Sequence, residues 1–223
     1  MSENIPSPEP GSALDAEPEA ELEAEPTDGR LLRGARARRT ITRHAVDVAS
    51  LEGLDGLSFG RLATDLRVSK SGIQTLFRTK KDLHLATVEA ARELFAGAVV
   101  RPAQTALPGA ARLRLLIEQW IEYAEKPLFT GGCFWAANLP AFDSRPGPVR
   151  DALAHQHRQW LALLAGETRH AIDAGEIASL DPDLAAFQID AVLNAANTAL
   201  RLDEQEATSK ARHVIEGLLA RPA

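Results

Sequence analysis

Apolar residues recur three and four positions apart along most of the chain, a spacing typical of amphipathic α-helices. Ala, Leu, Arg and Glu dominate the composition and Tyr and Ile are scarce, which also favours helix over sheet. We therefore expect an all-α protein. Apolar stripes, capping residues and proline or glycine breaks place helices at about 40–51, two short ones within 58–77, then 80–99, 109–126, 133–139, 148–174, 182–202 and 206–220.

The stretch 58–77, SFGRLATDLRVSKSGIQTLF, predicts two short helices joined by a tight turn. Leu62 and Leu66 lie on the apolar face of the first helix, and the Ser69 hydroxyl can cap the second. This is the spacing of a helix-turn-helix, whose second helix is presented to the DNA major groove. A surface helix pair within a helical core is the alternative. The candidate base and phosphate contacts on the second helix are Ser69, Lys70, Ser71, Gly72, Gln74 and Thr75.

Together with its flanks, this stretch resembles the N-terminal domain of the TetR family of bacterial transcription regulators over about residues 38–88. Gln74 departs from the family pattern, which usually has an aromatic residue there, and Leu76 stands where His is common. The roles of those family residues therefore do not carry over, although Gln74 can pair with adenine. The resemblance is carried by Thr40, Ile41, Ala45, Ala49, Gly53, Leu57, Ser58, Leu62, Ala63, Val68, Ser69, Lys70, Gly72, Phe77, Lys80, Asp82 and Leu83.

The net charge of −6 is unevenly distributed. Residues 1–30 hold nine acidic side chains and one arginine, and we expect a disordered acidic tail because little there can be buried. An acidic arm that competes with DNA is the alternative. Residues 31–84 hold eleven Lys and Arg against five Asp and Glu, as expected for a DNA-binding domain. Residues 85–223 are expected to form a helical domain for effector binding and dimerisation.

Further phosphate contacts are expected around the helix-turn-helix. Arg36, Arg38 and Arg39 precede the first predicted helix, where they can reach phosphates or simply make a charged helix entrance. Ser58 can cap the first of the two short helices within 58–77 and can hold a phosphate at its N-terminus. Lys80 is expected to bind phosphate as well.

Aromatic side chains gather between residues 120 and 142 and, together with Trp160, can line a pocket for a small molecule or simply fill a core. Cys133 is expected to be an inert buried thiol. The predicted pocket residues are Trp120, Tyr123, Phe129, Cys133, Phe134, Trp135, Asn138, Phe142, His155, Gln156 and Trp160.

Alanines leave little bulk on one face of the last two predicted helices, so another helix can approach closely. Periodicity does not distinguish internal packing from a dimer seam. The family resemblance implies that these helices pair with their twofold mates, and a dimer reads two half-sites of a palindrome. The alanines concerned are Ala185, Ala186, Ala191, Ala195, Ala196 and Ala199.

No Cys/His cluster, phosphate-binding loop or catalytic constellation is recognisable, so we expect no metal, no cofactor and no enzyme activity. One cysteine and no run of 18 apolar residues fit a cytoplasmic protein that does not enter a membrane. We expect a homodimeric DNA-binding regulator, usually a repressor in such families, released from a palindromic operator by an apolar small molecule. A ligand-independent DNA-binding dimer and a helical enzyme with a structural N-terminal bundle are the alternatives.

Overall fold

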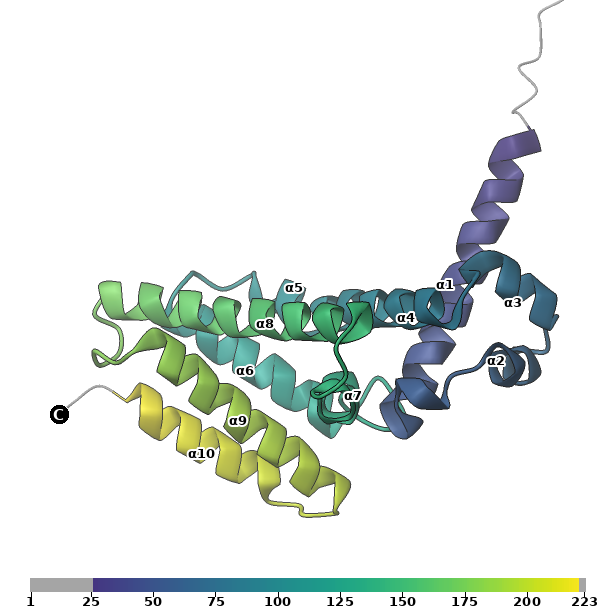
Figure 1. The fold of residues 1–223 in the computed structure, drawn as a ribbon. Helices are drawn as coiled ribbons and strands as arrows, with labels where there is room; N and C mark the ends of the chain where they lie inside the picture. The colour runs from purple at the N-terminus through teal and green to yellow at the C-terminus, as the bar shows by residue number, and fades with distance from the viewer. Residues whose placement is uncertain (1–25, 221–223) are drawn as a thin grey trace, which may run out of the picture.

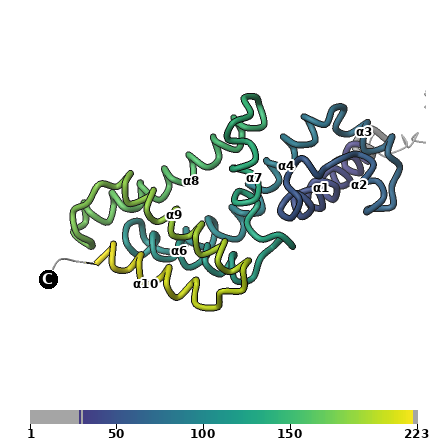
Figure 2. Tube along the Cα trace, turned by 60° about the horizontal axis from the view of Figure 1, so that its bottom comes forward, coloured from purple at the N-terminus to yellow at the C-terminus, as the bar shows by residue number. Residues whose placement is uncertain are grey.

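The computed structural model describes residues 26–220, with backbone alone at residues 26–28 and 30. The described chain is helical and holds no strand, as expected. Figures 1 and 2 show a small head at one end of a longer helical body. The head consists of α1 (Pro26–Glu52), η1 (Leu54–Gly56), α2 (Phe59–Leu66) and α3 (Lys70–Phe77). The body consists of η2 (Ala96–Val100), α5 (Arg101–Ala103), α6 (Ala110–Glu125), α7 (Phe134–Phe142), α8 (Pro148–Asp173), α9 (Pro182–Arg201) and α10 (Ala207–Leu219).

Helix α4 (Lys80–Phe95) connects head and body. It was expected to end near Val99, but the helical path continues through the π-helical turn η2 into α5 and reaches Ala103. In Figure 1, α4 leaves the head beside α1 and lies along α8 in the body. Among the described residues, no helix has an apolar stretch fit to cross a bilayer.

Helix α1 is longer than the sequence indicated, because it begins at Pro26 and not near Thr40. Residues 26–30, expected in the disordered tail, form its first turns, and the arginines expected ahead of the helix lie inside it. The reason is local: Leu, Ala and Arg are strong helix formers, and no proline interrupts residues 27–52. The rest of the predicted tail, residues 1–25, lies outside the described residues.

The short head helices begin at the capping residues that the sequence predicted. Ser58 accepts a hydrogen bond from the Arg61 N–H at 3.0 Å, and Ser69 accepts one from the Gly72 N–H at 3.1 Å. Thr79 and Asp82 form a reciprocal capping box at the start of α4. The head therefore closes over a small core through local signals. Its largest fully buried side chains are Leu54, Leu57, Leu62, Ile73, Phe77 and Leu83.

In the body, α8 begins at Pro148 as predicted, and Asp181 caps α9 by accepting from two backbone N–H groups. Helix α7 differs from expectation, because it continues through Pro140 to Phe142 instead of ending before the proline. The N-terminus of α6 is capped from a distance. Buried Glu167 accepts from the Gly109 N–H at 2.9 Å, and Glu176 accepts from the Ala110 N–H at 2.7 Å.

The loop before α7 lies directly on the end of α1. The Thr130 N–H donates to Asp47 Oδ1 at 2.7 Å, and the Gly131 N–H donates to Ser50 Oγ at 3.0 Å. A side chain at Gly131 would overlap the backbone carbonyl of Ser50. Only glycine permits this close approach of two backbones, so residue 131 fixes how the body meets the head.

Gly131→Ala should therefore loosen this joint. We expect a loss of about 1–3 kcal/mol in the free energy of unfolding, measured by urea denaturation, because the backbone must move to relieve the overlap. Gly166→Ala, within α8, is the matched control, since no atom lies within 4 Å of the added carbon. That control should stabilise by about 0.5–1 kcal/mol. Equal stability of Gly131→Ala and the wild type would contradict the close contact.

Candidate functional site

The outer surface of α3 presents the residues that the sequence singled out. Lys70, Ser71, Gln74 and Thr75 are all exposed. Thr75 donates to the Ser71 carbonyl in its own helix, whereas neither Lys70 nor Gln74 makes a side-chain hydrogen bond to the described residues. These two side chains therefore keep their hydrogen-bonding groups available for a partner outside the chain.

Arg38 is placed differently from Arg36 and Arg39. Its guanidinium donates to the Leu76 carbonyl at 2.8 Å and lies 4.5 Å from the centre of the Phe77 ring. It therefore holds the end of α3 against α1. Arg36 and Arg39 are exposed, and no side-chain hydrogen bond or ion pair engages them within the described residues.

Two other predicted phosphate contacts also have internal partners. The Ser58 hydroxyl accepts the bond that caps α2, and Lys80 Nζ donates to the Asp55 carbonyl at 3.2 Å. Gly72 has a steric role, since an added side chain would lie 2.9 Å from the capping Ser69 hydroxyl. Sequence reasoning placed these residues in the correct elements and anticipated the cap at Ser58, but it did not anticipate the internal bond of Lys80.

The head also exposes basic side chains that the sequence reasoning passed over. Arg67 and Arg78 end α2 and α3 with left-handed φ angles of 55° and 51°, and both side chains are exposed. Their position at the ends of the two short helices was the sequence feature that could have indicated their exposure. Arg61, in contrast, is paired with Asp65 at 2.8 Å. Hydrogen bonds from His44 and then Arg61 lower the pKa of the Asp65 carboxyl.

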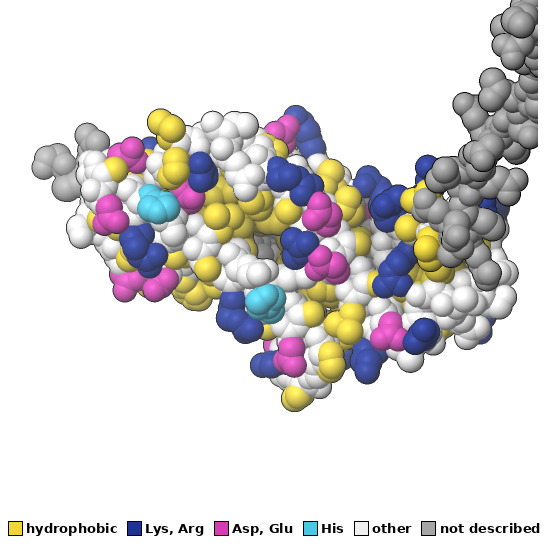
Figure 3. All heavy atoms as spheres, turned by 90° about the horizontal axis from the view of Figure 1, so that it is seen from above, with side chains coloured by type: hydrophobic (Ala, Val, Ile, Leu, Met, Phe, Trp, Pro, Cys, Tyr) yellow, Lys and Arg dark blue, Asp and Glu magenta, His cyan; other side chains and the backbone are white. Residues whose placement is uncertain are grey.

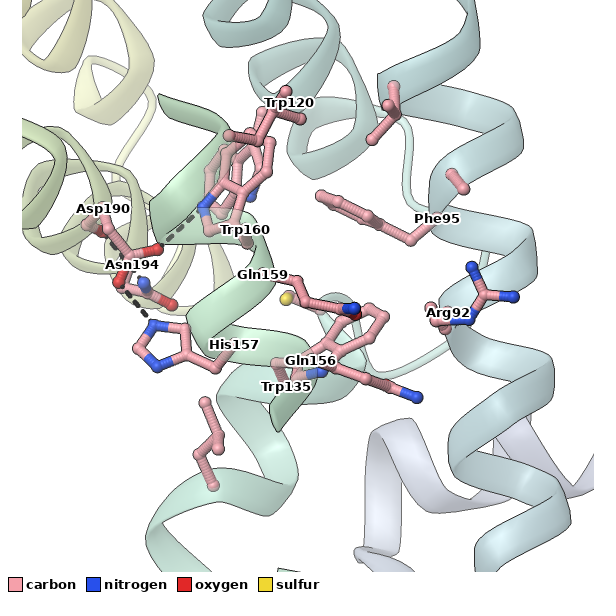
Figure 4. A pocket seen from close by; sticks show the side chains of 15 residues that line it. Arg92, Phe95, Trp120, Trp135, Gln156, His157, Gln159, Trp160, Asp190 and Asn194 are labelled. Atoms are coloured by element: carbon pink, nitrogen blue, oxygen red, sulfur yellow. Dashed lines mark hydrogen bonds and ion pairs between the residues drawn. The ribbon is translucent and has the colours of Figure 1, made fainter. Parts of the chain in front are cut away.

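A cavity of about 230 Å³ lies in the body between α4, η2, α6, α7, α8 and α9. Figure 3 shows hydrophobic side chains around a hollow near the middle of one face, and Figure 4 shows the lining. The π-helical turn η2 widens the helix beside this cavity, a feature common at functional positions. Its lining residues are Arg92, Phe95, Ala96, Val100, Trp120, Cys133, Trp135, Leu139, Gln156, His157, Gln159, Trp160, Leu163, Asp190 and Asn194.

Phe95 is the centre of the aromatic wall. Its ring makes edge contacts with Tyr123, Trp135 and Trp160 at centroid separations of 5.5, 5.2 and 5.4 Å. Edge-to-face pairs at these separations are favourable, so the rings support one another. The three tryptophans of the chain, which include Trp120, all line this one cavity.

Asp190 supplies the carboxylate at the α9 side of the cavity. Its Oδ1 accepts from Trp160 Nε1 at 3.0 Å, and its Oδ2 lies 2.9 Å from His157 Nε2 (Figure 4). The cavity also touches Cys133, and burial raises the pKa of its thiol, which agrees with the inert cysteine expected from the sequence. Burial likewise raises the pKa of the neighbouring Tyr123 hydroxyl.

The structure brings only some of the predicted pocket residues to the cavity. Trp120, Cys133, Trp135, Gln156 and Trp160 line it. The others do not line it: Tyr123, Phe129 and Phe134 are buried, Phe142 packs under the Arg145 guanidinium, His155 is exposed, and Asn138 faces the head.

The lining residues that sequence reasoning missed come mainly from α4 and η2, and from α9. Phe95 and Asp190 are examples, and each is far in sequence from the aromatic stretch that directed the prediction. Local composition gave no signal for them, because only the packing of α4 and α9 against α8 brings them together.

Asn138 is a joint between body and head, and its amide is fully buried. Its Oδ1 accepts from the Leu54 N–H at 2.7 Å, and its Nδ2 donates to the carbonyls of Ala49 at 3.0 Å and Phe134 at 2.8 Å. On the same helix, Trp135 and Leu139 line the cavity. Helix α7 therefore touches the cavity and the head at once.

The outer face of α9 and α10 is apolar and exposed. Phe187 is 63% exposed and Val214 is 54% exposed. Both border a shallow groove with Ala191. The predicted alanine face divides in two, because a helix has more than one packed side: Ala185, Ala186 and Ala196 are buried, whereas Ala191 and Ala195 are exposed and Ala199 is half-buried.

Comparison with known proteins gives a family match in the body. Residues 109–215 match the family described as "Tetracyclin repressor-like, C-terminal domain". No curated protein matches the chain.

Solved structures match nearly the whole described chain. A TetR transcriptional regulator from Chloroflexus aurantiacus is 21% identical, with 84% of this chain and 94% of that chain covered and a TM-score of 0.75. A transcriptional regulator from Saccharomonospora viridis in complex with choline is 19% identical, with coverages of 82% and 95% and a TM-score of 0.71. AibR, in complex with isovaleryl coenzyme A and operator DNA, is 19% identical, with coverages of 83% and 99% and a TM-score of 0.68. At these identities, the similarity establishes the fold.

Asn138→Leu should weaken the joint between α7 and α1. The change keeps a side chain of similar size but leaves the buried Leu54 N–H without its acceptor, so we expect the free energy of unfolding to fall by about 2 kcal/mol or more. Urea denaturation measures this. The control is Asn194→Leu, which removes one bond to the Asp190 carbonyl in its own helix and should cost less than about 1 kcal/mol. Equal losses in the two variants would show that the Asn138 bonds contribute nothing special.

Proposed function

We propose that this chain, whose residues 109–215 match a tetracycline repressor-like C-terminal domain, is a DNA-binding transcriptional regulator of the TetR family and that it is a repressor. In this proposal it acts in the cytoplasm, where a small molecule bound in the body releases it from a palindromic operator. The chain acts as a binding protein and not as an enzyme. The observation that carries the proposal is the position of α7 and α4, which each contact both the cavity and the head.

Charge and exposure support DNA as the partner of the head. Residues 31–84 hold eleven Lys and Arg against five Asp and Glu, although the chain as a whole is acidic. Arg36, Arg39 and Lys70 extend charged groups that no described residue neutralises, as phosphate contacts require. Gln74, with a free amide on the outer face of α3, is suited to pair with a base edge.

Two copies of the chain would present two heads. We assign the dimer contact to the outer face of α9 and α10, where Phe187 and Val214 are exposed beside small alanines. Burial of this face would remove large apolar side chains from water, and the small residues would let the helices approach closely. A twofold dimer would read a palindrome with one α3 helix in each half-site.

Release would follow from a shift between two arrangements of the heads. A ligand that contacts Trp135 and Leu139 acts on α7, and Asn138 on the same helix bonds the end of α1. A ligand that contacts Phe95 acts on α4, which continues into the head beside α3. If the ligand binds more tightly to the arrangement whose head spacing does not fit the operator, it lowers the protein's affinity for the operator. The decrease is typically about 5–150-fold, for a coupling free energy of about 1–3 kcal/mol. AibR, which shares the fold, was solved in complex with isovaleryl coenzyme A and operator DNA, so this fold can hold both a small molecule and DNA.

Lys70→Ala should weaken binding to all duplex sequences alike, because a phosphate contact carries no sequence information. We expect the slope of log affinity against log salt concentration to fall by about one for each head, measured by fluorescence anisotropy from low to moderate salt. Gln74→Ala should keep the slope and reduce selectivity for the operator over random DNA. The control is Arg169→Ala, an exposed arginine on α8 at the end of the body remote from the head, which should change neither. Salt-independent binding by the wild type would remove DNA as the partner.

Phe187→Glu should convert the dimer to a monomer, because it places a charge at the centre of the proposed contact. Light scattering after size exclusion at micromolar concentration measures the mass. Leu107→Glu is the control, since Leu107 is 80% exposed in the loop before α6, away from α9 and α10. A Phe187→Glu protein that remains a dimer would place the contact on another surface.

A further inference from the structure

We propose that the cavity selects a small organic cation with an apolar body, held by the Asp190 carboxylate and the surrounding aromatic rings. This proposal rests on the effector role of the cavity and specifies the chemical class of ligand. A neutral apolar molecule is the competing occupant.

Charge at the lining carries the first part of the argument. Asp190 is 14% exposed at its side chain, and its carboxylate oxygens lie 3.0 Å from Trp160 Nε1 and 2.9 Å from His157 Nε2. The other charged lining residue, Arg92, is already compensated by Glu89 at 2.6 Å and Glu93 at 3.5 Å. Asp190 is therefore the one carboxylate that lines the cavity among the described residues, and the one lining arginine is already paired. A carboxylate this far from water is stabilised more strongly by an added cation than one in solvent.

The aromatic wall of the cavity is the second feature that favours an organic cation. Trp120, Trp135, Trp160 and Phe95 all line the cavity. An organic cation near such rings gains attraction from their negative faces, and tryptophan is the strongest partner. Asp190 also fixes the orientation of Trp160 through the indole N–H. One carboxylate thus supplies the charge and positions a ring.

The volume of the cavity and its remaining polar groups further define the chemical class of the ligand. A volume of about 230 Å³ equals roughly eight water molecules of liquid, so the occupant has on the order of ten non-hydrogen atoms. Trp135 Nε1 and Gln156 Oε1 are buried without hydrogen-bond partners among the described residues. The natural ligand is therefore expected to carry an acceptor and a donor as well as its charge.

The test compares two molecules of almost identical shape, phenyltrimethylammonium and its uncharged carbon analogue tert-butylbenzene. The quenching of tryptophan fluorescence follows binding directly, because every tryptophan of the chain lines the cavity. We expect the full-length wild-type protein to bind the cation at least tenfold more tightly than the neutral analogue.

Asp190→Asn supplies the matched variant, since asparagine keeps an oxygen for Trp160 Nε1 and loses the charge. It should weaken phenyltrimethylammonium binding at least tenfold and leave tert-butylbenzene binding within about twofold, which also shows that the cavity is intact. Asp183→Asn removes an exposed carboxylate from the first turn of the same helix and should change neither affinity.

Tert-butylbenzene binding as tight as that of the cation would overturn the proposal, as would failure of the wild type to bind the cation. The comparison of the two probes on the wild-type protein tests the proposal even if the Asp190→Asn variant fails to fold. Salt-dependent operator binding, measured on the same protein, distinguishes failure of the cation proposal from failure of the proposed function. A protein that binds operator DNA but neither probe remains a DNA-binding regulator, and the cation proposal fails.

Discussion

The side-chain amide of Asn138 is buried between α7 and the end of α1, where two of its three hydrogen bonds, to Leu54 and Ala49, join the body to the head. A buried amide holds position strongly because any displacement leaves donors and acceptors without water to replace their partners. The neighbouring contact at Gly131 adds a steric limit, since two backbones meet there without a side chain between them. Together they prevent α7 from moving without α1.

That constraint gives the cavity its significance. Trp135 and Leu139 border the cavity one helical turn or less from Asn138, so a ligand that displaces α7 also strains the bonds to Ala49 and Leu54. The Asp55–Arg145 ion pair supports the same junction, and the hydrogen bond from Arg145 lowers the pKa of the Asp55 carboxyl. The ends of α7 and its flanking loops are thus tied to the head on several sides. We regard this junction, together with α4, as the route by which the occupant of the cavity acts on α3.

The features that sequence predicted well are those fixed by neighbouring residues. Ser58, Ser69 and Asp181 cap helices because each needs only the backbone two or three positions ahead. The helix-turn-helix and the aromatic character of the cavity were found in the same way. The start of α1 was predicted too late, because the arginine-rich residues before Thr40 were assigned to phosphate contact ahead of the helix although Leu, Ala and Arg are strong helix formers.

The features that sequence could not give depend on distant partners. Arg38 has the composition of a phosphate contact, but its bond to Leu76 spans 38 residues. Asn138 was expected in the pocket, and its partners lie more than 80 residues away. Asp190 and Phe95 reach the cavity only through helix packing. In each case the residue type was informative, and the partner was decided by the tertiary fold.

Amide hydrogen exchange at Leu54, followed by NMR in the native protein, tests the central claim most directly. If the side-chain Oδ1 of Asn138 holds this N–H and α7 stays fixed to α1, the Leu54 amide should exchange about as slowly as the Ala49 amide in the core of α1. Both amides would then exchange through the same cooperative opening. Exchange at the rate of an unprotected peptide would show that α7 separates freely from the head, and the proposed route from cavity to α3 would fail.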